Sequence, residues 1–169
     1  MDAVKAVMTR RSIRKYKKKD VPKKLIMKLI DAARQAPSAY NDQPWEFIVV
    51  KNKETMKKIT KYKSKFMLDA PVWIFCGYNK NKSSTEHDLE NTALAIENLL
   101  ITAHAMGLGA VYTGGYDPGD KSLEKAISKA LNLPKNVHIV SIVCVGWPDE
   151  EPGEKEMRPL SNMTHFETF

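Results

Sequence analysis

Apolar residues recur along this chain at two spacings, and these spacings predict a mixture of helices and strands. A spacing of three and four residues, bounded by capping residues or proline, is typical of helices that bury one face. It predicts helices over about 3–9, from Pro22 to just before Pro37, after Asn52, over 88–106 and over 119–131. Short continuous apolar runs are typical of buried strands. They predict strands over 45–50, 71–77, 110–116 and 137–147, with a polar loop over 78–86.

The longest predicted helix, over 88–106, is apolar around most of its circumference. It contains neither glycine nor proline, and Leu94, Leu99 and Ile101 extend its apolar surface beyond a single face. At 1.5 Å per residue such a helix spans about 27 Å, roughly the width of a domain. One domain of this size is too small to cover it on every side, so we expect an obligate homodimer. The alternative is an ordinary core helix in a monomer.

Length and composition fit a single domain over 1–169. The chain has 169 residues, of which 43% are hydrophobic and 28% are charged, and this length allows a sizeable core. The C-terminal tail, about 148–169, is rich in proline and glutamate but ends in apolar residues. We expect the tail to pack on the partner subunit or on the active site.

Charge and cysteine usage narrow the class of protein. The formal net charge of +7 permits anionic partners, although the lysines are scattered and most are expected to be solvated. No apolar run reaches the roughly 18 residues that a membrane span needs, and no apolar signal region begins the chain. Cys76 and Cys144 lie within apolar strands, as buried reduced thiols do. The sequence therefore predicts a cytoplasmic protein without a membrane or metal partner.

Two polar segments carry the candidate chemistry. The first gathers three guanidiniums, an ammonium and a hydroxyl within six residues, at Arg10, Arg11, Ser12, Arg14 and Lys15. Guanidinium groups match phosphate oxygens two at a time, and a hydroxyl adds a neutral donor. The second segment, over 36–45, is a turn-rich, amide-rich loop that leads into a strand. Together they predict a site for a phosphorylated, planar, polar cofactor.

Other catalytic classes lack their motifs. The four histidines stand at no metal-ligand spacing, and no G-x-G-x-x-G follows the first strand. His104 lies on the long helix and is interpreted as a satisfied core histidine. Residues 114–122 resemble a P-loop, but Asp120 stands where the phosphate-binding lysine belongs. The basic residues do not gather around an aromatic strand, so nucleic-acid binding is not expected. An enzyme of this kind would take its chemistry from a bound cofactor.

The order of these motifs resembles the nitroreductase family of FMN flavoproteins. Nearly the whole chain follows that order: R-R-S-I-R-K-Y, then A-P-S-A-Y-N-D-Q-P-W-E-F before a strand, then a long apolar helix ending in G-L-G, a glycine-bearing strand and V-G-W-P-D-E-E-P. The resemblance implies an α+β sandwich in which a mainly antiparallel central sheet is flanked by helices. It also implies an intertwined homodimer with two FMN sites at its interface.

The resemblance further implies which residues hold FMN. The N-terminal segment binds the cofactor, the polar loop reaches the flavin from the other subunit, a strand end lies near the isoalloxazine ring, and basic residues of the tail reach the phosphate. In that order the residues are Arg10, Arg11, Ser12 and Arg14; Pro37, Ser38, Ala39, Asn41 and Gln43; Thr113, Gly114 and Gly115; and Lys155 and Arg158. The alternative roles are a complement to a helix dipole for the first two arginines and a solvated tail for the last two residues.

The activity that the resemblance implies is a ping-pong oxidoreductase. NADH or NADPH reduces the bound FMN, and a nitroaromatic, a quinone or a similar small molecule is reduced in turn, with no catalytic side chain required. The alternatives are a dehalogenase-like or flavin-modifying enzyme of the same fold, or a flavin-binding protein of low turnover. The chain is too short for the additional segment that covers the active site in many relatives. We therefore expect an open pocket or one roofed by the partner's tail.

Overall fold

The computed structural model describes residues 1–169 and contains five helices and four strands. The helices are α1 (Ala3–Thr9), α2 (Lys23–Ala33), α3 (Lys53–Thr60), α4 (Asp88–Ala105) and α5 (Ser122–Leu131). The strands are β1 (Trp45–Val50), β2 (Val72–Asn79), β3 (Gly109–Gly114) and β4 (Val137–Gly146). Short 3₁₀ helices lie at Ala39–Asn41, Lys65–Asp69, Lys80–Lys82 and Leu160–Asn162.

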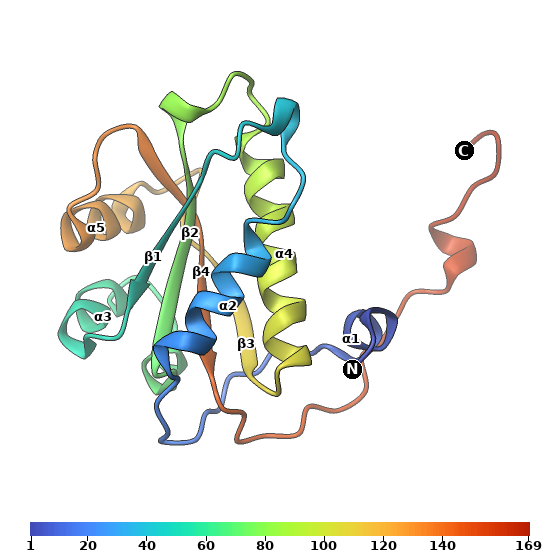
Figure 1. Cartoon of the computed structure of the whole chain (residues 1–169), viewed down its shortest axis with the longest axis horizontal. Coiled ribbons are helices and arrows are strands. Elements are labelled where there is room, and N and C mark those ends of the chain that lie inside the picture. Colours follow the sequence, from blue (N-terminus) through green and yellow to red (C-terminus); the bar gives the residue numbers. More distant parts are fainter.

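The strands form one antiparallel sheet in the order β1-β2-β4-β3. Strands β2 and β4 are central, whereas β1 and β3 are the edges. Helices α2 and α4 cover one face of the sheet, and α3 and α5 cover the other (Figure 1). The arrangement confirms the α+β class and the antiparallel sheet flanked by helices.

Each face of the sheet has its own hydrophobic core. Successive side chains of β2 alternate between the two faces: Ile74 packs in the cluster that contains Leu99 of α4, whereas Trp73 and Phe75 pack with α3 and α5. Every residue over 72–76 is fully buried. This burial on both faces explains why the strand has a continuous apolar sequence instead of an alternating one.

Capping residues begin and end helices where the sequence predicts. Asp2 Oδ1 accepts the Lys5 N–H at 2.9 Å, and Asn52 Oδ1 accepts the Thr55 N–H at 3.0 Å. Both caps satisfy donors that the first helical turn leaves open. Gly107, with φ of 75°, ends α4 in the left-handed conformation that favours glycine. These three predictions are confirmed.

Several boundaries differ from the prediction: α2 ends at Ala33 instead of just before Pro37, and β3 ends at Gly114 instead of at residue 116. Pro22 precedes α2 in an extended conformation and is not part of its first turn. Strand β2 continues to Asn79 because it pairs with the beginning of β4. Helix α5 starts only at Ser122, since Asp120 Oδ1 accepts the Ser122 N–H at 2.8 Å and holds the preceding residues in a turn.

Helix α4 is buried against the sheet but keeps apolar side chains at the surface. Ala95, Leu99 and Ala103 are fully buried, whereas Leu89 and Leu94 remain 44% and 47% exposed. A single chain therefore does not cover the whole circumference of α4, as the sequence predicts.

The cysteines lie as expected, and one histidine does not. Cys76 and Cys144 are buried free thiols, and burial raises the pKa of both, that of Cys144 to about 12. His104 Nε2 is hydrogen-bonded to Thr9 Oγ1 at 2.8 Å. The prediction of a satisfied histidine is confirmed, but its place in the core is wrong. His104 is only half-buried because it lies where α1 meets α4.

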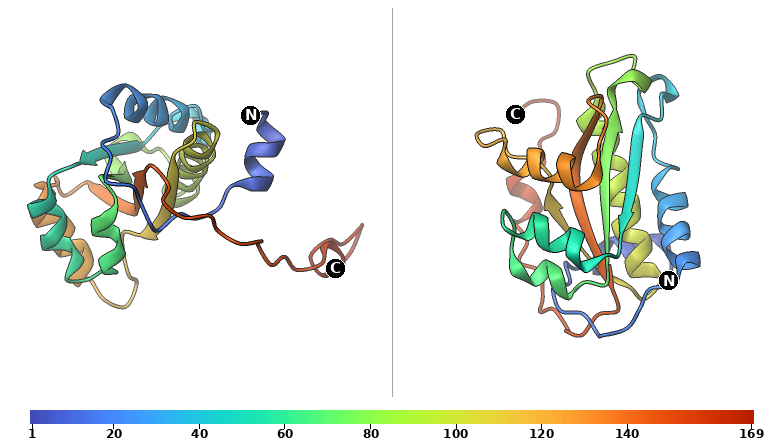
Figure 2. Two further views of the ribbon diagram at one scale, coloured as in Figure 1. Left: turned by 90° about the horizontal axis from the view of Figure 1, so that it is seen from below. Right: turned by 90° about the vertical axis from the view of Figure 1, so that its left-hand side faces the viewer.

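Both ends of the chain project from the body. Helix α1 stands beside the C-terminal half of α4, and residues 151–169 run outward as an exposed arm (Figures 1 and 2). Val4 and Met8 on α1, and Phe166 on the arm, are largely exposed. None of the helices combines the length and the apolar composition needed to traverse a membrane.

The register of β2 against β4 shifts at Gly77, and this position generates a stability prediction. A Cβ at Gly77 would overlap the carbonyl oxygen of His138, so Gly77→Ala must displace backbone in the centre of the sheet. We expect the free energy of unfolding in urea to fall by about 3 kcal/mol. Gly153→Ala is the control, because no atom lies within 4 Å of a Cβ there, and it should change stability by less than about 0.5 kcal/mol. Equal stability of the two variants would contradict the prediction.

Candidate functional site

The segment that follows α1 is fixed along the edge strand β3. Ser12 forms a parallel bridge with Ala110, and the Ile13 N–H donates to the Ala110 carbonyl oxygen at 3.0 Å. Gly109 permits this approach, because a Cβ at that position would overlap the Ile13 side chain. The backbone thereby places Arg10 and Ser12 beside β3 and next to α4.

A cleft of about 360 Å³ opens where this segment, α4 and β3 meet. Its lining consists of Arg10, Ser12, Ala93, Ile96, Glu97, Leu100 and Tyr112. The four residues from α4 lie on one helix face because they are spaced by three or four positions. Alternation along β3 puts Tyr112 on the same side of the strand as Ala110.

The Arg10 guanidinium brings unmet hydrogen-bonding capacity to this cleft. Its Nε is buried and has no hydrogen-bond partner, and its ion-pair partner, Glu97 Oε1, is 3.5 Å from that atom. A donor buried without a partner costs about 1–3 kcal/mol. Phosphate is an anion that suits a guanidinium and a neighbouring hydroxyl such as that of Ser12.

The other two arginines of the segment lie differently. Arg11 Nη1 donates to the carbonyl oxygens of Met8 and Arg10 at 3.2 and 3.0 Å. It thereby complements the C-terminus of α1, which is the alternative role considered above, although its Nε is also buried without a partner. The Arg14 side chain is exposed, and its backbone N–H donates to the Glu150 carboxylate. Arg10 and Ser12 therefore line the cleft, whereas Arg11 and Arg14 do not.

The surroundings of Arg10 are electropositive. Burial lowers the pKa of His104, and the guanidiniums of Arg10 and Arg11 lower it further. An imidazole with a pKa below its ordinary 6.5 is neutral at pH 7 and adds no third charge. This end of α4 therefore holds two close guanidiniums whose repulsion a bound anion would relieve.

The polar loop over 37–43 lies by the first turn of α4, outside the cleft that holds Arg10. Tyr40, Asn41 and Gln43 have φ values of 51°, 60° and 51°, in the left-handed region that residues other than glycine seldom adopt. Ser38 Oγ accepts the Gln43 N–H at 3.0 Å and closes the loop. Strained backbone of this kind persists where the surroundings enforce it, and it clusters at functional sites.

Side chains from two other segments hold this loop in place. Asn91 Oδ1 on α4 accepts the Ala39 N–H at 3.0 Å. Asp42 Oδ2 accepts both the N–H and the hydroxyl of Ser84 at 2.7 Å, and these bonds lower the pKa of Asp42. The loop is therefore tied to α4 on one side and to the 79–87 connection on the other.

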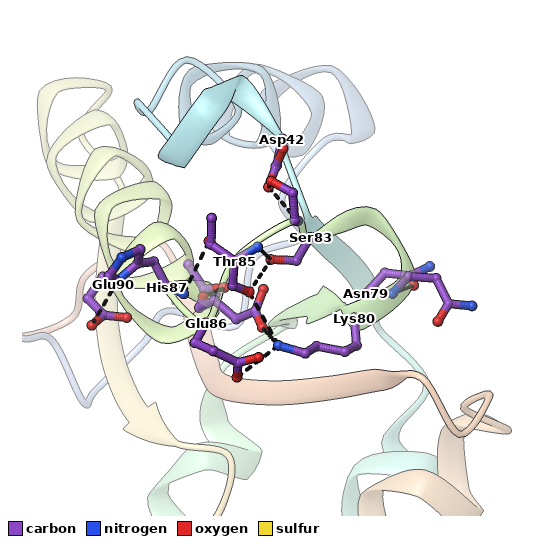
Figure 3. Close-up of polar contacts among 12 residues, drawn as sticks. Asp42, Asn79, Lys80, Ser83, Thr85, Glu86, His87 and Glu90 are labelled. Atoms are coloured by element: carbon purple, nitrogen blue, oxygen red, sulfur yellow. Dashed lines mark hydrogen bonds and ion pairs between the residues drawn. The ribbon is translucent and has the colours of Figure 1, made fainter.

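A lysine ties the 79–87 connection to α4 (Figure 3). Lys80 Nζ lies 2.9 Å from Asp88 Oδ2, 3.1 Å from Glu86 Oε2 and 3.3 Å from the Thr85 carbonyl oxygen. The hydrogen bond to Asp88 is the main cause that raises the pKa of Lys80. Asp88 Oδ1 and Asn91 Nδ2 are buried without partners. The first turn of α4 is thus a buried polar anchor for the loop.

The end of β3 is fixed by neighbouring segments. The Thr113 hydroxyl donates to the backbone of β4 at 3.0 Å, and Lys63 Nζ donates to the Gly114 carbonyl oxygen at 2.8 Å. The Gly115 N–H donates to the Val140 carbonyl oxygen at 2.9 Å, and a Cβ on Gly115 would press on β4. Packing within the chain therefore explains Gly115, whereas Gly114 has an open side where a Cβ would meet nothing closer than 3.6 Å.

The basic residues of the tail, Lys155 and Arg158, lie on the exposed arm. The tail first passes the N-terminal segment, and part of it lines a second cleft of about 540 Å³ that also includes Arg10 and Arg11. Neither Lys155 nor Arg158 lines either cleft. Arg158 Nη2 donates instead to the Asn162 carbonyl oxygen at 2.7 Å.

One chain therefore brings together only part of the predicted site. Arg10 and Ser12 share a cleft against the middle of α4, but the 37–43 loop lies by the first turn of that helix and lines no part of the cleft. No pattern in the sequence predicted the remaining cleft residues, which are Ala93, Ile96, Glu97, Leu100 and Tyr112. The helical spacing of the first four was an available signal, but it does not say which segment faces them.

The antiparallel sheet flanked by helices defines an α+β protein, and the cleft at its edge holds a guanidinium whose Nε lacks a hydrogen-bond partner. The profile described as the nitroreductase family matches residues 7–64 and 59–147. This chain belongs to the nitroreductase family, which confirms the resemblance found in its sequence.

Known proteins agree with this assignment. A protein of Methanothermobacter thermautotrophicus, provisionally named NADH dehydrogenase/NAD(P)H nitroreductase, is 38% identical over 93% of this chain and 83% of its own length. A solved structure of the same provisional name from Parabacteroides distasonis superposes with a TM-score of 0.91, at 29% identity over 99% of this chain and 98% of that one. An FMN-dependent nitroreductase from Clostridium difficile R20291 gives a TM-score of 0.84, at 30% identity over 98% and 99%.

The bond from Ala39 to Asn91 generates a prediction about the loop. Asn91→Ala removes the acceptor and leaves the Ala39 N–H without its protein partner, so we expect a loss of about 1–3 kcal/mol in the free energy of unfolding. The neighbouring Glu90 is exposed and pairs only with His87, at 3.8 Å. Glu90→Ala, measured by the same urea titration, should therefore stay within about 0.5 kcal/mol of the unaltered protein. An Asn91→Ala variant as stable as this control would show that the bond does not support the fold.

Proposed function

We propose that this protein is an NAD(P)H-dependent oxidoreductase that uses bound FMN. The observation that carries the proposal is the buried, unpartnered Arg10 Nε beside Ser12 in the edge cleft. Family membership and the FMN-dependent relative of known structure support the same ligand. The donor set fits a phosphate monoester, and the walls from Ile96, Leu100 and Tyr112 fit the less polar remainder of a flavin.

The residues that would hold FMN come from four places. The N-terminal segment and the tail supply positive charge for the phosphate, the strained loop supplies uncharged polar groups, and the end of β3 offers the open side of a glycine near the ring. We assign Arg10, Arg11, Ser12 and Arg14; Lys155 and Arg158; Pro37, Ser38, Ala39, Asn41 and Gln43; and Thr113, Gly114 and Gly115. The Gly115 N–H is already bonded to Val140, so Gly115 would contribute its backbone shape instead of a donor.

We also infer that two copies of the chain form the active unit. Loop 37–43 lies by the first turn of α4 and contributes no residue to the Arg10 cleft, which lies against the middle of that helix, so a loop from a second copy would complete the site. Exposed apolar side chains on α4, α1 and the tail support association, because contact with a second copy would remove them from water; they include Leu89, Leu94, Val4, Met8 and Phe166. The arm over 148–169 would then pack on the partner. Sedimentation of the purified protein at twice the mass of one chain is the expected result.

FMN, when bound, supplies the redox chemistry by accepting a hydride equivalent from NAD(P)H and delivering electrons to a second substrate. The chain itself binds and orients the cofactor through the residues assigned above. We propose a small nitroaromatic, quinone or similar molecule as the acceptor, in two alternating half-reactions. Because this chemistry resides in the cofactor, the absence of a conspicuous acid–base pair in the sequence agrees with it.

The absorbance spectrum of the holoenzyme tests the proposal. The purified protein should be yellow and release FMN on denaturation. Under anaerobic conditions NADH or NADPH should bleach the flavin absorbance, and addition of a quinone should restore it. A flavin that stays oxidised with both nucleotides would contradict the oxidoreductase and favour a flavin-binding protein of low turnover. A colourless protein that does not take up added FMN would contradict the cofactor as well.

The phosphate assignment generates a binding prediction. Arg10→Ala removes a charge-assisted donor that is worth about 1.5–3 kcal/mol, so the Kd for FMN should rise about 10- to 100-fold. Arg158→Ala should weaken binding in the same direction, by a smaller factor because its arm is exposed. Arg34→Ala is the control, since that side chain pairs with Asp31 at 2.6 Å on the outer face of α2. Unchanged FMN affinity in both test variants, measured by quenching of flavin fluorescence, would exclude the assignment.

A further inference from the structure

Glu97 places a carboxylate inside the cleft assigned to the flavin phosphate. It lines the same space as Arg10 and Ser12, and its Oε1 is 3.5 Å from Arg10 Nε. That nitrogen is buried and makes no hydrogen bond. The Glu97 carboxylate and a bound flavin phosphate would therefore compete for the same Arg10 guanidinium.

The contact between Arg10 and Glu97 is loose compared with the ion pair that Asp88 makes at the start of α4. Lys80 and Asp88 approach to 2.9 Å, and the Asp88 side chain is only 5% exposed. The Glu97 side chain is 50% exposed, and its carboxylate lies too far from Arg10 Nε for a hydrogen bond. A carboxylate so open to water is readily rehydrated when its partner turns away. The geometry of the Arg10–Glu97 pair therefore allows another anion to take the place of the Glu97 carboxylate.

We propose that Glu97 is an internal counter-ion: it holds Arg10 while the cleft is empty and opposes the flavin phosphate when the phosphate enters. This inference rests on the proposed function. A phosphate that takes the donors of Arg10 leaves the Glu97 carboxylate beside it without its partner, and like charges at short range disfavour the complex. Glu97 thus weakens binding of the phosphorylated flavin and sets the site for exchange of FMN instead of permanent retention.

Glu97→Gln tests this role, because it removes the charge and keeps the size of the side chain. The full-length protein, freed of flavin, is titrated into FMN and, separately, into riboflavin, and the quenching of flavin fluorescence gives each Kd. We expect Glu97→Gln to lower the Kd for FMN about tenfold. The Kd for riboflavin should stay within twofold of the unaltered protein, because riboflavin has no phosphate.

Glu90→Gln is the matched control, since Glu90 lies on the same helix, is exposed and does not line the cleft. It should leave both dissociation constants unchanged. An FMN affinity that is unchanged or weaker in Glu97→Gln overturns the proposal, and so does an equal change for riboflavin, which would indicate an altered pocket and not a charge effect. An unaltered protein that binds neither flavin would contradict the proposed function itself. Binding of FMN by the unaltered protein without the expected response in Glu97→Gln would contradict this inference alone.

Discussion

The backbone pairing of Ser12 and Ile13 with Ala110 is the interaction on which the site depends. Without it, Arg10 would follow a short terminal helix into solvent, where an unpaired guanidinium costs nothing. The pairing brings Arg10 against α4 and buries its Nε, which converts an ordinary surface arginine into a donor that lacks an acceptor. Gly109 makes this possible, because any side chain there would push the Ile13 side chain off the edge of the sheet. This backbone pairing therefore fixes the place of the Arg10 guanidinium beside α4.

Helix α4 connects the sheet, the strained loop and the cleft. Its buried face joins the sheet to α2, its first turn anchors the strained loop through Asn91, and its middle part, from Ala93 to Leu100, forms a wall of the cleft. No residue of the 37–43 loop lines that cleft, so within one chain the loop and Arg10 belong to separate places on the helix. The separation and the exposed Leu89 and Leu94 have a common explanation if a second copy packs along the same helix.

Local signals in the sequence explain which parts of the fold were predictable. The caps at Asp2 and Asn52 and the end of α4 at Gly107 depend on neighbouring residues only, so they were placed correctly. The extension of β2 to Asn79 depends on pairing with a strand about sixty residues further along, and no local pattern encodes it. The predicted core position of His104 was wrong for the same reason, because tertiary packing decides which turn of α4 meets α1.

The candidate site, too, could be predicted only where local sequence patterns indicate its residues. Arg10, Ser12 and the loop were found because their residue types stand close together in the sequence and resemble a family pattern. Glu97 and Tyr112 lie on elements that the sequence predicts. Their place beside Arg10 could not be predicted, because it depends on how α1, α4 and β3 pack together. The anchor from Asn91 to Ala39 likewise joins segments more than fifty residues apart, so it became visible only in three dimensions.

The anchor also explains how a strained loop persists within one chain. Three left-handed residues other than glycine cost on the order of 1–3 kcal/mol each, with asparagine toward the low end because it tolerates this region. The hydrogen bonds that the side chains of Ser38, Asn91 and Asp42 accept contribute about 0.5–1.5 kcal/mol apiece. They offset only part of the strain, so the packing around the loop supplies the rest. A ligand or partner that contacts the loop in this conformation needs to add little to fix it, because the ordering has already taken place.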